Sequence, residues 1–369
     1  MPLASQQSRQ AAVVPALLRH CKRLTRSFIA DGRRISYIHI YARPVTARRE
    51  PPLEFITAKE SGFEGIACVD DVARAAVLAL QAYERLGFRS ALHLARGWLN
   101  FVLYVQEPDG RFVNFICDES GAKNMTGWTS YPGGPWWDTR ARWALATAWR
   151  ITGDDRYRRA FERGDFTPTA CFKVTSLQAL VLMEVYAIRP SQDLQDRICA
   201  LCDRVMGGFN AYFRDRIGQR KVGMWGYHQL QALARAGRLF SRLDYIAACR
   251  STVEHLVEPV VADGFYHTYP TQQDSQCAYD VSTLVLGLEE LYGVTGETRY
   301  RDLALRCAAW LDGNNVMGEP LGDPRTGRCA DGIGEDGVSP NCGAESAIEA
   351  GFTYLARRRL QADAAALSG

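Results

Sequence analysis

Apolar residues recur at intervals of three and four along most of the chain, which is the period of an α-helix. This pattern predicts twelve helices. They cover residues 8–30, 70–87, 90–106, 138–152, 154–163, 174–189, 191–215, 226–239, 241–258, 279–294, 297–313 and 343–359. After the first of them, the stretch ISYIHIYARP (35–44) predicts a short β segment.

The connections between the predicted helices are of two kinds. Some are short polar turns, such as LGFRS (86–90), TGDDRY (152–157) and TGETRY (295–300), in which glycine ends one helix and a polar residue caps the next. The others are long and rich in Gly, Trp, Tyr and Pro. This alternation predicts helical hairpins with a loose repeat of ~50–65 residues.

The first helix of each predicted hairpin is apolar nearly all round. Examples are AAVLALQAY, ARWALATAW and STLVLGLEELY. A helix that is apolar on every side is buried, so six such helices are best accommodated by closing into a ring. We therefore expect an all-α (α/α)6 toroid forming a single domain over residues 1–369. The open alternative, a solenoid, normally has shorter and more regular repeats.

Composition and charge narrow the functional classes. Lysine and arginine number 44 against 41 acidic residues, so the formal net charge is only +3 and no nucleic-acid partner is expected. No window approaches the ~18 apolar residues of a membrane span, and the N-terminus lacks the pattern of a signal peptide. Eleven scattered cysteines are typical of a reduced, cytoplasmic protein. The oligomeric state stays open.

Cofactor and metal motifs are absent from the sequence. Cys199-x-x-Cys202 has a spacing found in zinc sites, but no second such pair or pair of histidines accompanies it. The loop DPRTGRCADGIGED, with Asp323, Asp331 and Asp336, lacks the regular oxygen ligands of a calcium loop and favours turns. We expect neither a metal nor a cofactor.

In a toroid, the N-termini of the inner helices line the floor of the cavity beneath the long loops. The polar and aromatic residues at these positions are Asp70, Asp71, Trp136, Trp137, Asp138, Lys173, Thr175, Tyr227, His228, Gln229, Tyr279, Asp280, Asn341 and Glu345. For each aspartate alone, helix capping is also an explanation, and Asp70 is the expected cap of its helix. The spacings Asp71-x-x-Arg74 and Asp138-x-x-x-Arg142 also suit local ion pairs.

Aromatic residues are frequent in the loops before these helices. They are Trp128, Tyr131, Trp136, Trp137, Trp225, Tyr227, Phe265, Tyr266 and Tyr269. Aromatic walls over a carboxylate floor suit a neutral polyhydroxylated ligand such as an oligosaccharide. Glycoside hydrolysis uses a pair of carboxyl groups, one as acid and one as base or nucleophile.

We therefore predict a glycoside hydrolase with Asp71 and Glu345 as the catalytic pair, and Asp138 and Asp280 in reserve. Arg74 is expected to keep Asp71 ionised, while Glu345 or Asp280 is the acid with the raised pKa. The predicted substrate-binding residues are Asp70, Arg74, Trp136, Trp137, Arg142, Tyr227, His228 and Asn341.

Three other functions fit parts of this pattern. A sugar isomerase, epimerase or uronate lyase would use His228 or Tyr227 to move a proton beside a carbonyl. An isoprenoid cyclase would use an acidic, aromatic cavity, although neither DxDD nor DDxxD is present. A non-catalytic sugar-binding protein would bind without turnover.

Four segments, taken in order, resemble the signatures of a carbohydrate-active (α/α)6-toroid family, similar to six-hairpin glycosidases and often found C-terminal to bacterial glycosyltransferase domains. These are CVDDVARAA (68–76), TRARWALATA (139–148), DPRTGRCADGI (323–333) and NCGAES (341–346). The residues that match in type are Asp70, Asp71, Arg74, Arg142, Asp323, Asp331, Asn341 and Glu345. The resemblance implies the toroid fold and a bacterial enzyme of carbohydrate metabolism. Val72 replaces an asparagine, and YDVS (279–282) lacks an expected glutamine.

Overall fold

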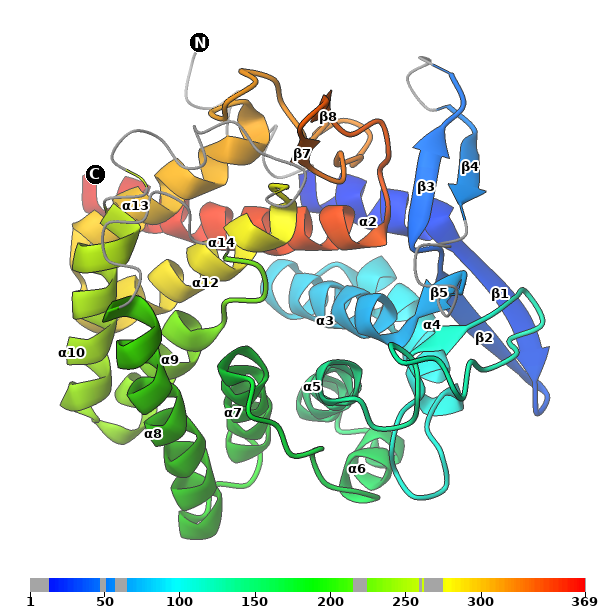
Figure 1. The fold of residues 1–369 in the computed structure, drawn as a ribbon, viewed down its shortest axis with the longest axis horizontal. Coiled ribbons are helices and arrows are strands. Elements are labelled where there is room, and N and C mark those ends of the chain that lie inside the picture. Colours follow the sequence, from blue (N-terminus) through cyan, green and yellow to red (C-terminus); the bar gives the residue numbers. More distant parts are fainter. Residues whose placement is uncertain are drawn as a thin grey trace.

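A computed structural model describes residues 13–46, 51–56, 65–214, 224–258, 261 and 275–368 (Figure 1). Six of its helices form an inner layer. They are α3 (Val69–Leu86), α5 (Pro135–Thr152), α7 (Phe172–Tyr186), α9 (Gln229–Phe240), α12 (Ala278–Thr295) and α14 (Ala344–Ser368). Each inner helix contacts the next one along the chain, and α14 returns to contact α3. The inner layer is therefore a closed ring.

A second set of helices surrounds this ring. They are α2 (Val13–Leu24), α4 (Arg89–Tyr104), α6 (Asp155–Glu162), α8 (Gln192–Arg214), α10 (Leu243–Thr252) and α13 (Thr298–Ala308). Each packs chiefly on one inner helix, α2 on α14 and α4 on α3 for example. A short π-helical turn, Val253–Val257, extends α10, and a 3-10 turn, Ala309–Asp312, follows α13. The predicted (α/α)6 toroid is confirmed, while the single-domain organisation stays a prediction.

The tight corners between paired helices have the predicted form. Gly87, Gly153 and Gly296 end α3, α5 and α12 in the left-handed conformation, with φ of 70°, 67° and 70°. Glycine adopts this conformation without the steric cost that a Cβ would impose. Asp154 then caps α6, because its side chain accepts a hydrogen bond from the Arg156 amide.

The first helix is predicted over residues 8–30, and its predicted C-terminal part is wrong because residues 25–30 form a strand. Residues 8–12 lie outside the described ranges. The helix α2 ends at Leu24, and β1 (Thr25–Ala30) pairs antiparallel with β2 (Arg33–Ile38). Asp31 and Gly32 form the turn with φ of 49° and 69°. Asp-Gly is a strong two-residue hairpin signal, and the helical period of the preceding residues obscured it.

Three further pairs of short strands are present among the described residues. They are β3 (Tyr41–Pro44) with β4 (Leu53–Ile56), β5 (Ala67–Cys68) with β6 (Phe115–Ile116), and β7 (Ile333–Gly334) with β8 (Gly337–Val338). The strands β2 and β3 divide the predicted β segment 35–44 between two ribbons. Because β5 leads directly into α3, it places the N-terminus of α3 beside the long loop that carries β6.

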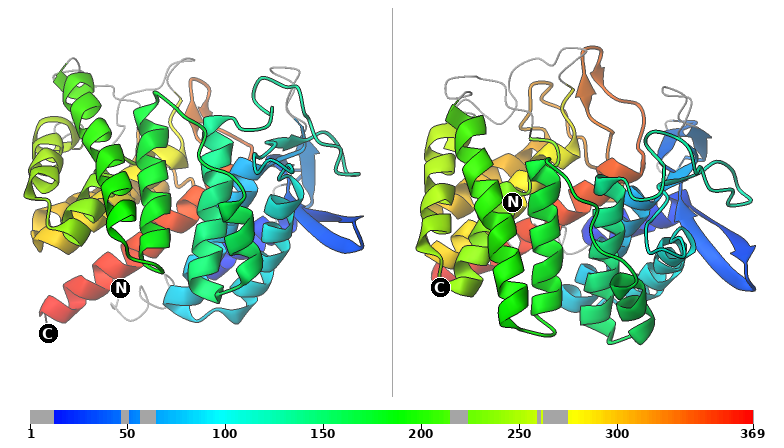
Figure 2. Two further views of the ribbon diagram at one scale, coloured as in Figure 1. Left: turned by 90° about the horizontal axis from the view of Figure 1, so that it is seen from below. Right: turned by 60° about the horizontal axis from the view of Figure 1, so that its bottom comes forward.

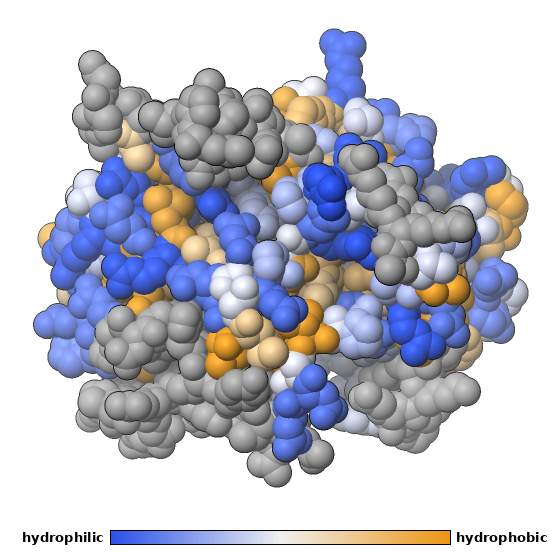
Figure 3. Space-filling model, turned by 90° about the horizontal axis from the view of Figure 1, so that it is seen from above, coloured by the Kyte–Doolittle hydropathy of each residue, from blue (hydrophilic) through white to orange (hydrophobic). Residues whose placement is uncertain are grey.

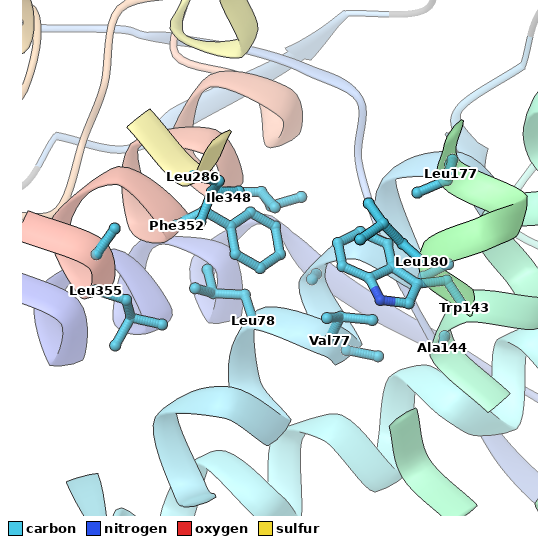
Figure 4. Close-up of a cluster of buried hydrophobic side chains, with 14 of the residues drawn as sticks. Val77, Leu78, Trp143, Ala144, Leu177, Leu180, Leu286, Ile348, Phe352 and Leu355 are labelled. Atoms are coloured by element: carbon cyan, nitrogen blue, oxygen red, sulfur yellow. The ribbon is translucent and has the colours of Figure 1, made fainter. Parts of the chain in front are cut away.

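The hydrophobic core fills the middle of the ring. Figure 4 shows side chains from several inner helices meeting there, among them Leu78 of α3, Trp143 of α5 and Phe352 of α14. The rings of Trp143 and Phe352 stack with centroids 5.7 Å apart. A Cβ at Gly351 would lie 2.4 Å from Leu78 Cδ2, so this glycine allows α14 to approach α3 closely.

The surface seen from above in Figure 3 carries many hydrophilic residues, with smaller groups of hydrophobic ones between them. Figure 2 shows that the longer of the described loops extend beyond one end of the helix layers, while short turns join the helices at the other end. Among the described residues, no helix has the length and apolar character needed to cross a bilayer.

Candidate functional site

The guanidinium of Arg74, on α3, lies at the centre of a cluster of four carboxyl groups. Its Nε is 3.1 Å from Asp70 Oδ1, and its Nη2 is 2.6 Å from Asp71 Oδ1 and 3.0 Å from Glu345 Oε2. Its Nη1 is 2.7 Å from Glu349 Oε1. The Arg74 side chain is only 2% exposed. The predicted residues Asp70, Asp71, Arg74 and Glu345 are thus brought together from α3 and α14.

The start of α3 explains how two adjacent aspartates reach one arginine. The N-cap is Cys68, whose Sγ accepts a hydrogen bond from the Asp71 amide at 3.4 Å. The expectation that Asp70 caps this helix is therefore wrong. Both aspartates lie in the first turn, three and four residues before Arg74, which is the spacing that puts helical side chains on one face.

Burial shifts the pKa of Asp71 in the direction opposite to the one expected from Arg74. Its pKa is raised to about 7, chiefly because burial penalises the charged form, and the nearby Glu345 and Asp70 add to the rise. The positive charge of Arg74 opposes this effect but does not overcome it. The sequence predicts that Arg74 keeps this pKa low, and burial raises it instead. Burial also raises the pKa of Glu349.

A second buried arginine adjoins the cluster. Arg140, on α5, has its Nε 3.3 Å from Asp70 Oδ1, although the two atoms are not aligned for a hydrogen bond. The Tyr279 ring, from α12, lies 5.0 Å from the Arg74 guanidinium and 5.2 Å from that of Arg140. Burial lowers the pKa of Arg140 to about 10. An aromatic face beside two cations is stabilising for both of them.

His228 precedes α9 and has partners at both ring nitrogens. Nε2 lies 3.2 Å from the Tyr279 hydroxyl, and Nδ1 lies 3.1 Å from Gln231 Oε1. Burial, together with the charge of Arg140, lowers the pKa of His228 well below its ordinary value. The imidazole is therefore neutral at physiological pH and is held in a fixed orientation.

Asp138 and Arg142, both predicted site residues, form a separate buried pair on α5. Arg142 Nε donates to Asp138 Oδ2 at 2.9 Å, and neither side chain is more than 1% exposed. The remaining Arg142 nitrogens donate to the carbonyl oxygens of Gly110, Phe161 and Gly164. These contacts tie two loops to α5 and do not involve Arg74 or its carboxylates.

Asp280 and Trp137 also make structural contacts. Asp280 Oδ2 accepts hydrogen bonds from the Cys277 amide at 3.1 Å and from the Cys277 thiol at 3.2 Å, which closes a capping box at the start of α12. The Trp137 indole donates to the carbonyl oxygens of Phe112 and Tyr131.

The other predicted aromatic and polar residues are distributed as follows. The rings of Trp136 and Trp225 meet edge to face, as do those of Trp225 and Tyr279, and Trp225 is 40% exposed. Tyr227 is buried. Asn341 lines a cavity of about 460 Å³ that the Asp323 loop borders. Phe265, Tyr266 and Tyr269 lie outside the described residues.

Sequence reasoning missed Arg140 and Glu349. Glu349 follows Glu345 by four residues, so helical spacing alone could have placed both on one face of α14. Arg140 lies two residues before Arg142, and the matching motif drew attention to the second arginine. Among the described residues, no group of three or more His, Cys, Asp or Glu side chains is placed to hold a metal ion.

No family model and no curated protein matches the sequence. Solved structures do match in fold. An alpha-1,6-mannanase of Salegentibacter sp. HEL1_6, as an inactive variant with alpha-1,6-mannotriose, has a TM-score of 0.61 at 10% identity, covering 95% of this chain and 99% of that chain. A D-mannose isomerase has a TM-score of 0.62 at 9% identity, with 97% and 99% covered. The cellobiose 2-epimerase from Spirochaeta thermophila DSM 6192 has a TM-score of 0.62 at 13% identity, with 98% of each chain covered. These likenesses confirm the toroid fold.

Proposed function

We propose that this protein is a glycoside hydrolase acting on an oligosaccharide, with Asp71 and Glu345 as its catalytic carboxyl pair. One observation carries the proposal. Asp71 Oδ1 and Glu345 Oε2 contact the same nitrogen of Arg74, although they come from the first and last helices of the inner ring. A shared guanidinium fixes both carboxyl groups relative to each other, which acid–base chemistry at a single bond requires.

The spacing of the pair favours a retaining mechanism. The two oxygens lie 2.6 Å and 3.0 Å from one nitrogen, so they cannot be farther apart than the sum of these distances, about 5.6 Å. Retaining glycosidases hold their carboxyl groups at about 5–5.5 Å, whereas inverting enzymes need roughly 6.5–9.5 Å to admit a water.

The electrostatics support a division of roles within the pair. Asp71, whose pKa is raised to about 7, carries a proton near neutral pH and donates it to the oxygen of the leaving sugar. Glu345, whose side chain is 35% exposed, attacks the anomeric carbon as a carboxylate and forms a glycosyl ester. Water then cleaves this ester while Asp71 takes back a proton.

The fold relatives include both hydrolases and isomerases, and two features favour the hydrolase. The mannanase relative is inactive after two consecutive aspartates are changed to asparagine, and this chain has a consecutive pair, Asp70 and Asp71, at its carboxylate cluster. An isomerase needs a base with a free lone pair, whereas both ring nitrogens of His228 have partners.

The first experiment measures hydrolysis of a panel of neutral oligosaccharides, beginning with alpha-1,6-mannotriose, by the wild type, Asp71→Asn and Glu345→Ala. We expect both variants to lose at least a hundredfold in kcat. Asp71→Asn should recover in kcat/KM, but not in kcat, on an aryl glycoside with a good leaving group, because only the first step then needs no acid. Glu345→Ala should recover with azide and release a glycosyl azide.

Asp155→Asn, at an exposed ion pair on α6, is the matched control and should keep wild-type activity. The anomeric configuration of the first product, read by NMR, should equal that of the substrate. Unchanged turnover in Asp71→Asn contradicts the proposal. Interconversion of free sugars with deuterium incorporated at carbon, and no new reducing ends, would identify an isomerase or epimerase instead.

A further inference from the structure

A large cavity lies on the outside of the ring, away from the carboxylate cluster. Its volume is about 1170 Å³, and its walls are the outer helices α2 and α4 and the β1–β2 hairpin. In Figure 1 this hairpin projects on the right, next to α4. The inner helix α3 packs against the other side of α4, so the cavity opens outward and not into the ring.

Basic side chains come from all three walls of this cavity. They are Arg19 and Lys22 of α2, Arg26 of β1, Arg34 of β2, and His93 and Arg96 of α4. Among the lining residues, all of which the structure describes, there is no aspartate or glutamate. The whole chain is nearly neutral, with a net charge of +3, so this is a local concentration of positive charge.

Within the part of the chain that the structure describes, the contacts of these side chains are to carbonyl oxygens and to one aromatic ring, that of Phe55, whose centroid lies 4.5 Å from the Arg26 guanidinium. Arg19 donates to the carbonyl oxygen of Arg325, and Arg26 donates to those of Arg23 and Thr25. Within the described ranges, none of the five arginine and lysine side chains pairs with a carboxylate. Clustered cations in a concave site raise the local concentration of anions.

The floor and one end of the cavity add further groups that suit an anion. The buried Trp98 indole donates to Thr25 Oγ1 at 3.2 Å, which fixes the floor. The hydroxyls of Ser27, Ser36 and Ser90 line the sides. Helix α4 begins here at Arg89, between the lining residues Phe88 and Ser90, and its N-cap residue, Phe88, has no side-chain group that could accept a capping hydrogen bond. An uncapped helix N-terminus is positive and donates backbone N–H groups.

We propose that this cavity binds a small ligand with at least two phosphate or sulfate groups. Guanidinium groups bind the oxygens of such groups in bidentate fashion. Cations on opposing walls favour a ligand with at least two anionic groups over one with a single such group. The volume exceeds the ~300–1,000 Å³ of common small-molecule sites, so it admits a carrier of disaccharide size between them. The site is independent of the catalytic proposal above.

The test uses inorganic pyrophosphate and a disulfated disaccharide as probes, and the unsulfated disaccharide as the neutral comparison. Binding is measured by titration calorimetry at low ionic strength, with the melting temperature as a second readout. We expect one of the two anionic probes to bind with a Kd below 1 mM, roughly −4 kcal/mol, and to weaken as salt increases. If pyrophosphate binds more tightly, the site prefers phosphate groups, and if the disulfated disaccharide does, it prefers sulfate groups.

Charge reversal locates the binding. The double variant Arg34→Glu/Arg96→Glu should weaken binding at least tenfold, and Arg34→Gln/Arg96→Gln guards against a folding defect of the first. Arg33→Glu is the matched control, because Arg33 lies on the same strand but does not line the cavity. Binding unchanged in both double variants, or no binding of either probe to the wild type, overturns the proposal.

Discussion

Arg74 of α3 and Glu349 of α14 join the first and last inner helices through a buried ion pair. Nη1 and Oε1 lie 2.7 Å apart, and each side chain is 2% exposed. Ser282 Oγ of α12 donates to the second Glu349 oxygen at 2.5 Å. Three inner helices are therefore connected at one carboxyl group, at the point where the ring closes.

The first prediction concerns this closure. Glu349→Ala should lower the free energy of unfolding by about 3 kcal/mol, because it leaves part of a buried guanidinium without its partner. This value is at the lower end of the range for breaking a buried ion pair, because Arg74 still contacts Asp70, Asp71 and Glu345. Denaturant titration measures the change. Glu54→Ala, at the exposed pair with Arg43, is the control and should cost less than ~1 kcal/mol.

The second prediction is a pH dependence that belongs to Asp71. Its pKa rises from 3.8 in the unfolded chain to about 7 in the folded protein, so the folded state keeps the proton up to a higher pH than the unfolded chain does. The stability that this group contributes is complete below about pH 4 and is lost as pH rises toward about 7. By this linkage, the free energy of unfolding of the wild type should fall by on the order of 4 kcal/mol, relative to that of Asp71→Asn, between about pH 4 and pH 7.

Urea titrations of both proteins at pH 4, 5.5, 7 and 8 check this difference. Glu349 has a raised pKa in both proteins, so its contribution largely cancels when the curves are subtracted. A difference that does not change between pH 4 and 8 would show that Asp71 titrates near its ordinary value. In the proposed mechanism, kcat also falls above about pH 7, where the acid has lost its proton.

The sequence predicted the ring because its signal is local and repeated: the helical period, the apolar inner helices and the glycine corners. It also placed Asp70, Asp71 and Arg74 on one helical face, since that placement needs only residue spacing. The partners on α14 and the second arginine, Arg140, depend on how helices far apart in sequence pack. No spacing within one segment contains that information.

The protonation of Asp71 could not be predicted for a related reason. The neighbouring Arg74 is visible in the sequence and argues for an ionised aspartate. The opposing cost is burial, which arises only when the ring closes over the start of α3, and it is the larger effect. The hairpin at Asp31 and Gly32 was missed for a different reason. Its turn signal is present in the sequence, but the helical spacing of apolar residues continues through the strand before it and predicted a helix.

The third prediction separates a structural from a catalytic role for Asp138. Its carboxyl group is fully buried against Arg142, which also holds two loops through the carbonyl oxygens of Gly110 and Gly164. Asp138→Ala should lower the free energy of unfolding by about 3 kcal/mol, because it leaves a buried cation unpaired. Asp138→Asn keeps an acceptor and should cost less. Turnover per folded molecule should stay within threefold of the wild type in Asp138→Asn. Loss of turnover at an unchanged melting temperature would instead make Asp138 catalytic.

The last prediction uses His228 to distinguish the two reaction classes. An isomerase or epimerase that takes a proton with this imidazole would lose at least a thousandfold in kcat when the base is removed. A hydrolase that relies on Asp71 and Glu345 should lose less than tenfold in His228→Gln, because glutamine can still hydrogen-bond Tyr279. Initial rates on the best oligosaccharide found in the panel provide the measurement. Tyr279→Phe is the companion variant, since it removes the hydrogen bond that His228→Gln retains but leaves the imidazole in place. Similar small losses in both variants would mean that His228 positions the Tyr279 ring beside Arg74 and Arg140 and moves no proton.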